Sequence, residues 1–194
     1  MTEPAVSPAA DDEIMPHLGP LAFLAGTWEG QQGRDIAPAR EGAHETHYRE
    51  RVTFEPIGPV VNGLQVLYGL RYSMVAWPLI QEHPFHEEVG YWLWDAERKQ
   101  VMRCFMVPRG VQINAGGSVE KDATTFHLTA EVGSTVYGIL SNPYLDQAAK
   151  TVRYDCTVTF HEPWKFSYEE DTQLQLAGRP EVFHHTDQNT LTRL

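Results

Sequence analysis

The feature that most constrains the fold is a two-residue alternation of apolar and polar side chains, which recurs from residue 45 onward. It is strongest over residues 150–160, where Val152, Tyr154 and Cys156 alternate with threonine, arginine and aspartate. Successive side chains of a β-strand point to opposite faces, so this period predicts strands with one buried face. Turn residues separate the segments, and helical periodicity is almost absent. An all-β domain is therefore expected.

The alternating segments predict roughly ten short strands joined by hairpins. This pattern favours an antiparallel up-and-down β-barrel of the lipocalin or fatty-acid-binding-protein kind, because closure removes exposed strand edges. Such a barrel is wide enough to enclose a small ligand. The expected strands span 27–32, 45–54, 64–74, 88–94, 101–107, 111–115, 124–132, 136–140, 150–160, 164–176 and 181–193. Loops are expected at 33–43, 55–59, 75–85 and 141–149, and a short helical turn at 20–24.

Composition predicts one domain and narrows the class of partner. The chain has 194 residues, which suits a single barrel over 17–194 preceded by a flexible tail over 1–16. The tail lacks the features of a signal peptide, and no apolar run is long enough to span a membrane, so a cytoplasmic protein with no membrane partner is expected. A net charge of −11 argues against nucleic acid as a partner. We therefore expect a small apolar or amphipathic ligand; a homodimer is compatible with the acidic surface.

Trp28 is the residue expected to close one end of the barrel. It lies in the stretch LAFLAGTWEGQQG, where an apolar run leads into a tryptophan with glycines on either side. An indole is large and rigid, and the nearby glycines permit sharp bends and close strand approach. An ordinary core position is the simpler alternative for Trp28.

Three segments together resemble the nitrobindin family of haem-binding β-barrels. GTWEGQQG is similar to the family's G-x-W-x-G-x-G, and HYRERVTFEPIG resembles its Y-x-E strand. HPFHEEVGYWLWD resembles its P-M-H-x-E-x-G segment, with His86, Glu88 and Gly90 in place. The resemblance extends from about Leu21 to the end of the chain. It implies a barrel that holds haem b, with a histidine near the C-terminus bound to iron.

The resemblance leaves the iron ligand open. The family's histidine begins the pattern H-L-x-x-x-L, which places it at Thr186 when Leu191 is the final leucine. His184 and His185 lie directly before that position. One inserted residue would make His185 the ligand, whereas strand alternation favours His184, because positions an even number of residues apart share a face. A divergent member without the axial histidine is the third possibility.

Other residues are candidates for the ligand cavity. We expect Tyr68 and Arg103 to contribute to the cavity or to closure of the barrel. His86 and Glu88 share a strand face and suit a buried polar pair better than a metal site, which needs more ligands. Arg103 could bind an acidic group of a ligand, although the outer side of a strand is the commoner place for arginine. Met102, Cys104 and Met106 share a face that is expected to pack in the core.

Two functions follow from these features. The first is haem binding with nitric-oxide or peroxynitrite chemistry at ferric haem, which would make the protein a peroxynitrite isomerase. The alternative is a non-enzymatic carrier or sensor of a fatty acid or another amphipathic molecule. Neither a phosphate-binding loop nor a nucleophile elbow occurs in the sequence.

Overall fold

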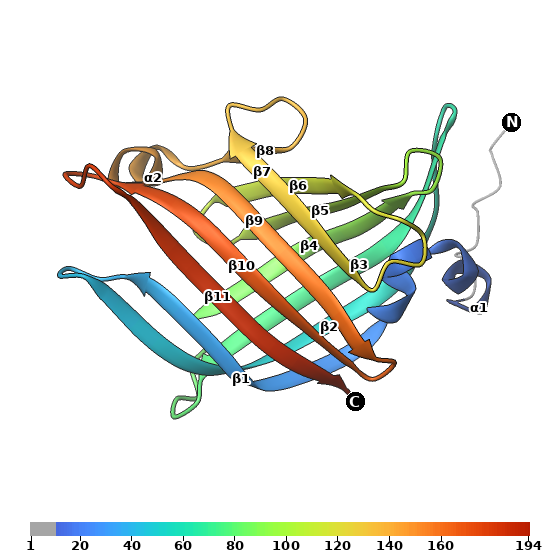
Figure 1. The fold of residues 1–194 in the computed structure, drawn as a ribbon, viewed down its shortest axis with the longest axis horizontal. Coiled ribbons are helices and arrows are strands. Elements are labelled where there is room, and N and C mark those ends of the chain that lie inside the picture. Colours follow the sequence, from blue (N-terminus) through green and yellow to red (C-terminus); the bar gives the residue numbers. More distant parts are fainter. Residues whose placement is uncertain (1–10) are drawn as a thin grey trace, which may run out of the picture.

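The computed structural model describes residues 11–194 and forms one closed β-barrel (Figure 1). The expected all-β barrel is confirmed, with eleven strands in the described chain. The strands are β1 (Gly26–Pro38), β2 (Ala43–Asn62), β3 (Gln65–Pro78), β4 (His86–Asp95), β5 (Gln100–Val107), β6 (Val111–Ser118), β7 (Thr125–Val132), β8 (Gly138–Leu140), β9 (Ala149–Glu162), β10 (Lys165–Leu176) and β11 (Val182–Arg193).

The barrel closes where β1 pairs with β11, so the first and last strands become neighbours. Around the barrel the order is β1-β11-β10-β9-β7-β8-β6-β5-β4-β3-β2. Strands that follow one another along the chain pair antiparallel almost throughout. The exception is the three-residue β8, which lies between β6 and β7 and runs parallel to β7. Closure satisfies the backbone groups that an open sheet would leave at its edges.

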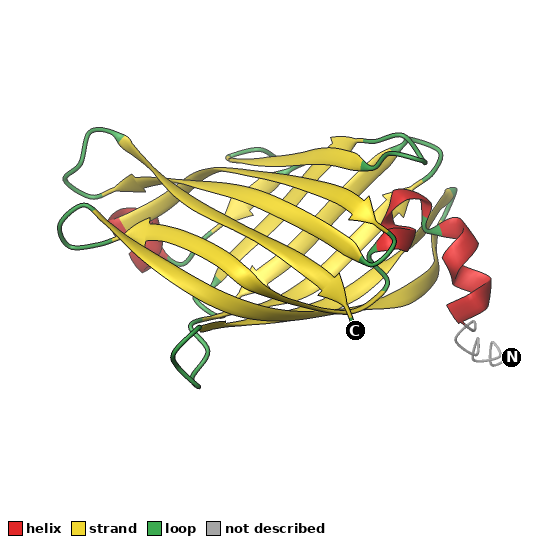
Figure 2. Cartoon of the chain, turned by 60° about the horizontal axis from the view of Figure 1, so that its bottom comes forward, coloured by secondary structure: helices red, strands yellow, loops and turns green. Residues whose placement is uncertain are grey.

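Short helical segments lie at both ends of the barrel (Figure 2). At one end are α1 (Asp11–Ile14), η1 (Met15–His17) and η2 (Gly19–Phe23), and near the other is α2 (Pro143–Ala148). The expected tail over 1–16 falls partly outside the described residues; its last part forms α1 and begins η1, with Ile14 buried. Each helix of residues 11–194 falls short of the length and hydropathy needed to cross a membrane.

An aromatic core fills the end of the barrel that the N-terminal turns cover. Trp28 is 1% exposed, and its indole N–H donates to the carbonyl of Leu24 over 2.7 Å. Phe166 meets the Trp28 ring edge-on, with 4.8 Å between ring centroids. Edge-to-face packing of this kind is a favourable arrangement of aromatic rings. Apolar burial therefore closes this end, and the remaining interior space lies toward α2.

A bulge in β1 explains why the first strand is longer than the sequence indicates. The strand was expected to end at residue 32, but it continues to Pro38, and only 39–42 remain as the turn. The register shifts between Gly30 and Gly33, so the bulge absorbs the irregular glycines. A Cβ on Gly33 would lie 2.4 Å from the Tyr48 ring. Glycine is needed there because the Tyr48 ring crosses the backbone.

Three other expected loops are shorter or contain structure. The expected turn at 55–59 lies inside β2, where a register shift between Ile57 and Val60 takes up the glycine and proline residues. The expected loop at 75–85 shortens because β3 continues to Pro78. The expected loop at 141–149 contains α2 instead. Asn142 caps this helix by accepting a 2.9 Å hydrogen bond from the Leu145 N–H, and a proline follows Asn142 at the first helical position.

The face of β5 that carries Met102, Cys104 and Met106 was expected to pack in the core, but it lies on the outside of the barrel. Arg103 and Phe105 point into the barrel and are buried, whereas Met106 is 51% exposed on the outside. Met102 and Cys104 lie on that same outer face. The methionines favoured the wrong face because the inner face of β5 carries Arg103, whose charge is compensated by Glu88 and Glu170 inside the barrel.

Candidate ligand cavity

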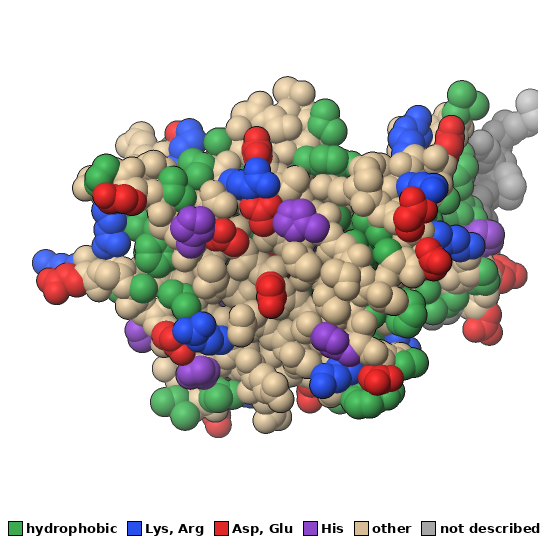
Figure 3. All heavy atoms as spheres, viewed as in Figure 1, with side chains coloured by type: hydrophobic (Ala, Val, Ile, Leu, Met, Phe, Trp, Pro, Cys, Tyr) green, Lys and Arg blue, Asp and Glu red, His purple; other side chains and the backbone are tan. Residues whose placement is uncertain are grey.

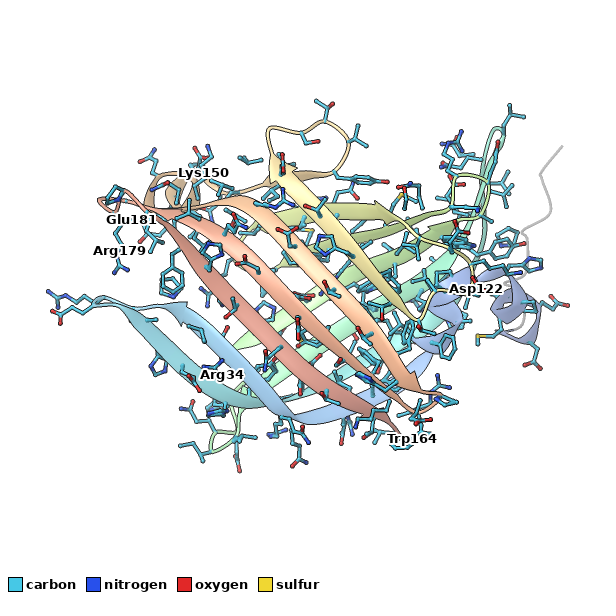
Figure 4. All side chains as sticks on the ribbon, viewed as in Figure 1. Arg34, Asp122, Lys150, Trp164, Arg179 and Glu181 are labelled. Atoms are coloured by element: carbon cyan, nitrogen blue, oxygen red, sulfur yellow. The ribbon has the colours of Figure 1, made fainter. Side chains whose placement is uncertain are left out.

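A cavity of about 420 Å³ occupies the barrel interior between the aromatic core and the α2 end. Its volume lies within the range of small-molecule sites. Figure 4 places Lys150, Arg179 and Glu181 at the α2 end of the barrel, and Asp122 and Trp164 toward the other end. The lining combines apolar walls with an unusual number of polar side chains. The apolar walls include Phe54, Met74, Phe85, Phe105, Val107, Val111, Ile113, Leu145, Phe166 and Leu174.

The polar lining arises because the inward-facing side chains change from apolar to polar along several strands. On β2 the inward face reads Phe54 and Val52 near the aromatic core, then Glu50 and Tyr48. On β10 the buried Phe166 and Tyr168 are followed by Glu170, which also lines the cavity. On β4, tryptophans give way to Glu88 and His86. Similar heights on different strands thus bring together acids, tyrosines and one arginine; the acids are Asp35, Glu50, Glu88, Glu170 and Asp187.

Arg103 is the centre of the first polar group. Its Nη2 donates to Glu88 Oε2 over 2.7 Å, and its Nη1 donates to Glu170 and to the Tyr154 hydroxyl. Its Nε donates to the Tyr72 hydroxyl over 3.3 Å. Burial by itself would lower the pKa of Arg103, but Glu170, the two tyrosines and Glu88 raise it well above its usual value. The guanidinium is therefore charged and satisfied, as a buried ion requires.

Glu88 links Arg103 to His86. Burial would raise the pKa of Glu88, but Arg103 and His86 lower it to about 2. His86 Nε2 lies 3.1 Å from Glu88 Oε1, and the Tyr72 hydroxyl donates to Glu88 Oε2 over 2.8 Å. Burial lowers the pKa of His86, yet the contact with Glu88 raises it overall. The H-x-E pair of the sequence is thus a buried polar pair, as expected.

A second polar group connects two carboxyl groups through tyrosines. The Tyr168 hydroxyl donates to Glu50 Oε2 over 2.7 Å and lies 2.8 Å from the Tyr48 hydroxyl, which in turn contacts Asp187. Asn189 Nδ2 also donates to Glu50 Oε2, over 2.9 Å. Burial raises the pKa of Glu50 to about 7, and burial with nearby acids raises the pKa of Asp187 well above its usual range.

The two neighbouring histidines of β11 lie on opposite sides of the barrel wall. His185 lines the cavity, and its Nε2 lies 2.7 Å from Oδ1 of the buried Asp35 on β1. His184 is on the outer surface, where its Nδ1 lies 2.7 Å from Asp171 Oδ2. Figure 3 shows histidine and acidic side chains beside one another on this outer face. Strand alternation forces this separation, so only His185 can meet a ligand inside the barrel.

Of the remaining predicted site residues, Trp28 and Tyr68 lie outside the cavity. Trp28 belongs to the aromatic core at the closed end. Tyr68 stacks on His17 of η1 with 4.6 Å between ring centroids, also at that end. His86, Glu88 and Arg103, in contrast, do line the cavity. Arg71, by contrast, is exposed and pairs with Glu55 on the outer surface.

The residues that sequence reasoning missed are the acids and tyrosines of the second group, together with Asp35. Tyr48 and Glu50 belong to the Y-x-E motif, but a polar residue that points into a barrel cannot be told from a solvent-facing one by its local sequence. Asp35 lies in β1, within the segment 33–43 that the sequence predicts to be a loop. The available signal was parity: Tyr48 and Glu50 share the inward face of Val52 and Phe54.

Comparison with known proteins identifies the family. Residues 17–193 match the model of the THAP4-like, heme-binding beta-barrel domain. The chain belongs to this family. The resemblance to nitrobindins predicted from the three sequence segments is therefore confirmed. The match covers nearly the whole described barrel, including β11 with His185.

Individual relatives are distant. A peroxynitrite isomerase from Renibacterium salmoninarum is 24% identical over 156 residues, covering 72% of this chain and 69% of the relative. A ferric nitrobindin-like protein from Streptomyces griseus is 33% identical over 91 residues, covering 45% of this chain and 42% of the relative. The crystal structure of Rv2717c from M. tuberculosis matches with a TM-score of 0.66 and 20% identity, covering 92% of this chain and 98% of that one. This last likeness concerns the fold alone.

Proposed function

We propose that this member of the haem-binding β-barrel family binds haem b in its cavity and that His185 binds the iron. The observation that carries the proposal is the position of His185, whose imidazole lines the cavity on β11, the strand that contains the position expected for an iron-binding histidine. Its neighbour His184 is excluded because it lies outside the barrel wall. A neutral imidazole nitrogen is the commonest protein ligand of haem iron in this type of site.

The remaining lining fits a porphyrin with two carboxylates. Phe85, Val107 and Leu145 offer apolar surface in the part of the cavity toward α2. Arg109 lines the same region and is exposed, so it can pair with a propionate while remaining hydrated. Of the five acidic side chains of the lining, Glu88 and Glu170 are paired with Arg103, which limits their repulsion of an anionic ligand.

Bound ferric haem would supply an iron centre for nitric oxide or peroxynitrite, and the name of the Renibacterium relative refers to the second of these. The residues of this chain would orient the group and exclude water from it. Met74 and Phe105 provide apolar contact surface. His86, fixed by Glu88, adds a hydrogen-bonding group to the cavity lining.

Titration with haemin tests the proposal. Wild-type protein and His184→Ala should develop the same sharp Soret band, and His185→Ala should show a shifted or broadened one. His184→Ala is a matched control because it removes an adjacent imidazole that lies outside the cavity. Identical spectra in all three proteins would remove His185 as the ligand. A stoichiometric lipid in an organic extract, with no haem uptake, would support the carrier alternative instead.

A further inference from the structure

Asp35 forms a hydrogen bond with Nε2 of His185, the ring nitrogen farther from the backbone. Oδ1 of Asp35 lies 2.7 Å from Nε2 of His185, and the contact crosses from β1 to β11. Asp35 is 5% exposed, so little water competes for its carboxylate. The His185 side chain is 32% exposed. This contact is therefore a close hydrogen bond between the proposed iron ligand, which is partly exposed, and a buried carboxyl group.

The hydrogen bond fixes where the imidazole carries its proton. An ionised carboxylate only accepts hydrogen bonds, so Nε2 must carry the hydrogen and, in a neutral ring, Nδ1 then has the lone pair. Iron binds a nitrogen with a free lone pair. Nδ1 is next to the ring carbon that bears Cβ, so the strand backbone crowds a large macrocycle at that nitrogen. Nε2 is the sterically accessible nitrogen, and it is the one that Asp35 occupies.

We propose that Asp35 competes with haem iron for Nε2 of His185 and thereby sets the haem affinity of the cavity. The proposal rests on the proposed function, since it needs iron to bind His185. To free Nε2, the hydrogen bond to Asp35 must break and the ring proton must move to Nδ1. A hydrogen bond to a charged group is stronger than one between neutral groups, so the competition lowers affinity.

Substitution of Asp35 by asparagine tests this competition because the side chain keeps its shape but loses its charge. We expect Asp35→Asn to bind haemin about tenfold more tightly than wild type in a Soret titration. Asp171→Asn is the matched control: it makes the same change at the pair with His184, at the same 2.7 Å separation, and should leave the affinity unchanged. Unchanged or weaker binding by Asp35→Asn would overturn the proposal.

A double variant separates this effect from a general loss of negative charge. In the His185→Ala background, Asp35→Asn should give no gain, because the nitrogen for which it competes is absent. An equal gain in both backgrounds would show that charge alone acts, and the proposal would fail. If His185→Ala binds haemin as wild type does, the proposed function fails. If His185→Ala loses binding but the single variant Asp35→Asn binds haemin no more tightly than wild type, only the competition fails.

The ring tautomer gives a readout that needs no haem. In ¹⁵N-labelled wild-type protein, we expect His185 to be protonated at Nε2 and to have its lone pair on Nδ1. Asp35→Asn should shift the ring toward the Nδ1-protonated tautomer, while Asp171→Asn should leave His185 unchanged. A wild-type His185 with its proton on Nδ1 would contradict the competition.

Discussion

Glu88 and Arg103 form a buried ion pair, with 2.7 Å between Glu88 Oε2 and Arg103 Nη2. They are not direct neighbours in the sheet, because the register of β4 and β5 sets Trp92 opposite Arg103. The guanidinium lies over the Trp92 ring, 5.0 Å from its centroid, and extends along the strand to the carboxylate. The pair places a charged group between the aromatic core and the open part of the cavity.

Arg103→Met should destabilise the protein by about 3–5 kcal/mol, because it leaves Glu88 and Glu170 as uncompensated buried acids. Urea unfolding would measure the loss. Arg71→Met is the control: it breaks an exposed pair with Glu55 and should leave the free energy of unfolding close to that of wild type. Equal effects of the two substitutions would contradict the assigned role of Arg103.

Glu50→Gln should change the pH dependence of stability. Burial raises the pKa of Glu50 from an ordinary 4.5 to about 7 in the folded protein. Between these pH values the native state holds a proton that the unfolded chain has released, so stability falls as pH rises. The full effect is about 3 kcal/mol at 1.36 kcal/mol per pH unit.

Glutamine has no such proton, so the variant should gain stability relative to wild type as pH rises from 4.5 to 8. Urea unfolding at several pH values measures the difference. Parallel curves for the two proteins would show that Glu50 is not the titrating group.

Gly33→Ala should destabilise the barrel by about 1–3 kcal/mol, because a Cβ would overlap the Tyr48 ring at 2.4 Å. Gly42→Ala is not a suitable control, since Gly42 has a positive φ of 74°. In the double variant Gly33→Ala/Tyr48→Ala, the ring that the new Cβ would overlap is absent. Its loss of unfolding free energy should therefore be smaller than the sum of the losses in the two single variants. Strict additivity in thermal or urea unfolding would argue against the contact.

Trp28→Phe should destabilise by about 1–3 kcal/mol, because it removes the donor to the Leu24 carbonyl in a buried setting. Trp164→Phe is the control, since Trp164 is 54% exposed and labelled on the outer edge in Figure 4. Thermal unfolding would compare them. The same midpoint for both variants would mean that the buried indole hydrogen bond contributes nothing.

Much of the fold could be predicted from local pattern. Strand alternation located the strands, and Asn142 before a proline contained the signal for α2, which was read as a loop. Bulges were the chief source of error: at Gly30–Gly33 and at Ile57–Val60, turn-forming residues lie inside continuous strands. A bulge is visible only once the partner strand is known, because the partner supplies the hydrogen bonds on either side of it.

The candidate site was harder to predict, because strand alternation shows which residues share a face but not which face points inward. From the expected ligand position at Thr186, alternation favours His184, but the structure puts His185 on the inward face with Asp187, Asn189 and Leu191. Thr186 itself does not share the face of Leu191, because five residues separate them, so the expected position is the wrong starting point for the alternation. Arg103 was expected to contribute to the cavity, and it does, but nothing local in the sequence identifies Glu88 and Glu170 as its partners.

Local alternation and short motifs are enough to predict the all-β class, the strand periods, the aromatic closure at Trp28 and the family. The pairing of Arg103 with Glu88 and Glu170, and the hydrogen bond between Asp35 and His185, depend on how the strands pack in the closed barrel. Glu88 and Arg103 lie on neighbouring strands, but Glu170 is 67 residues from Arg103 and Asp35 is 150 residues from His185. The closure of β1 on β11 brings Asp35 and His185 together, and no local pattern encodes that distance.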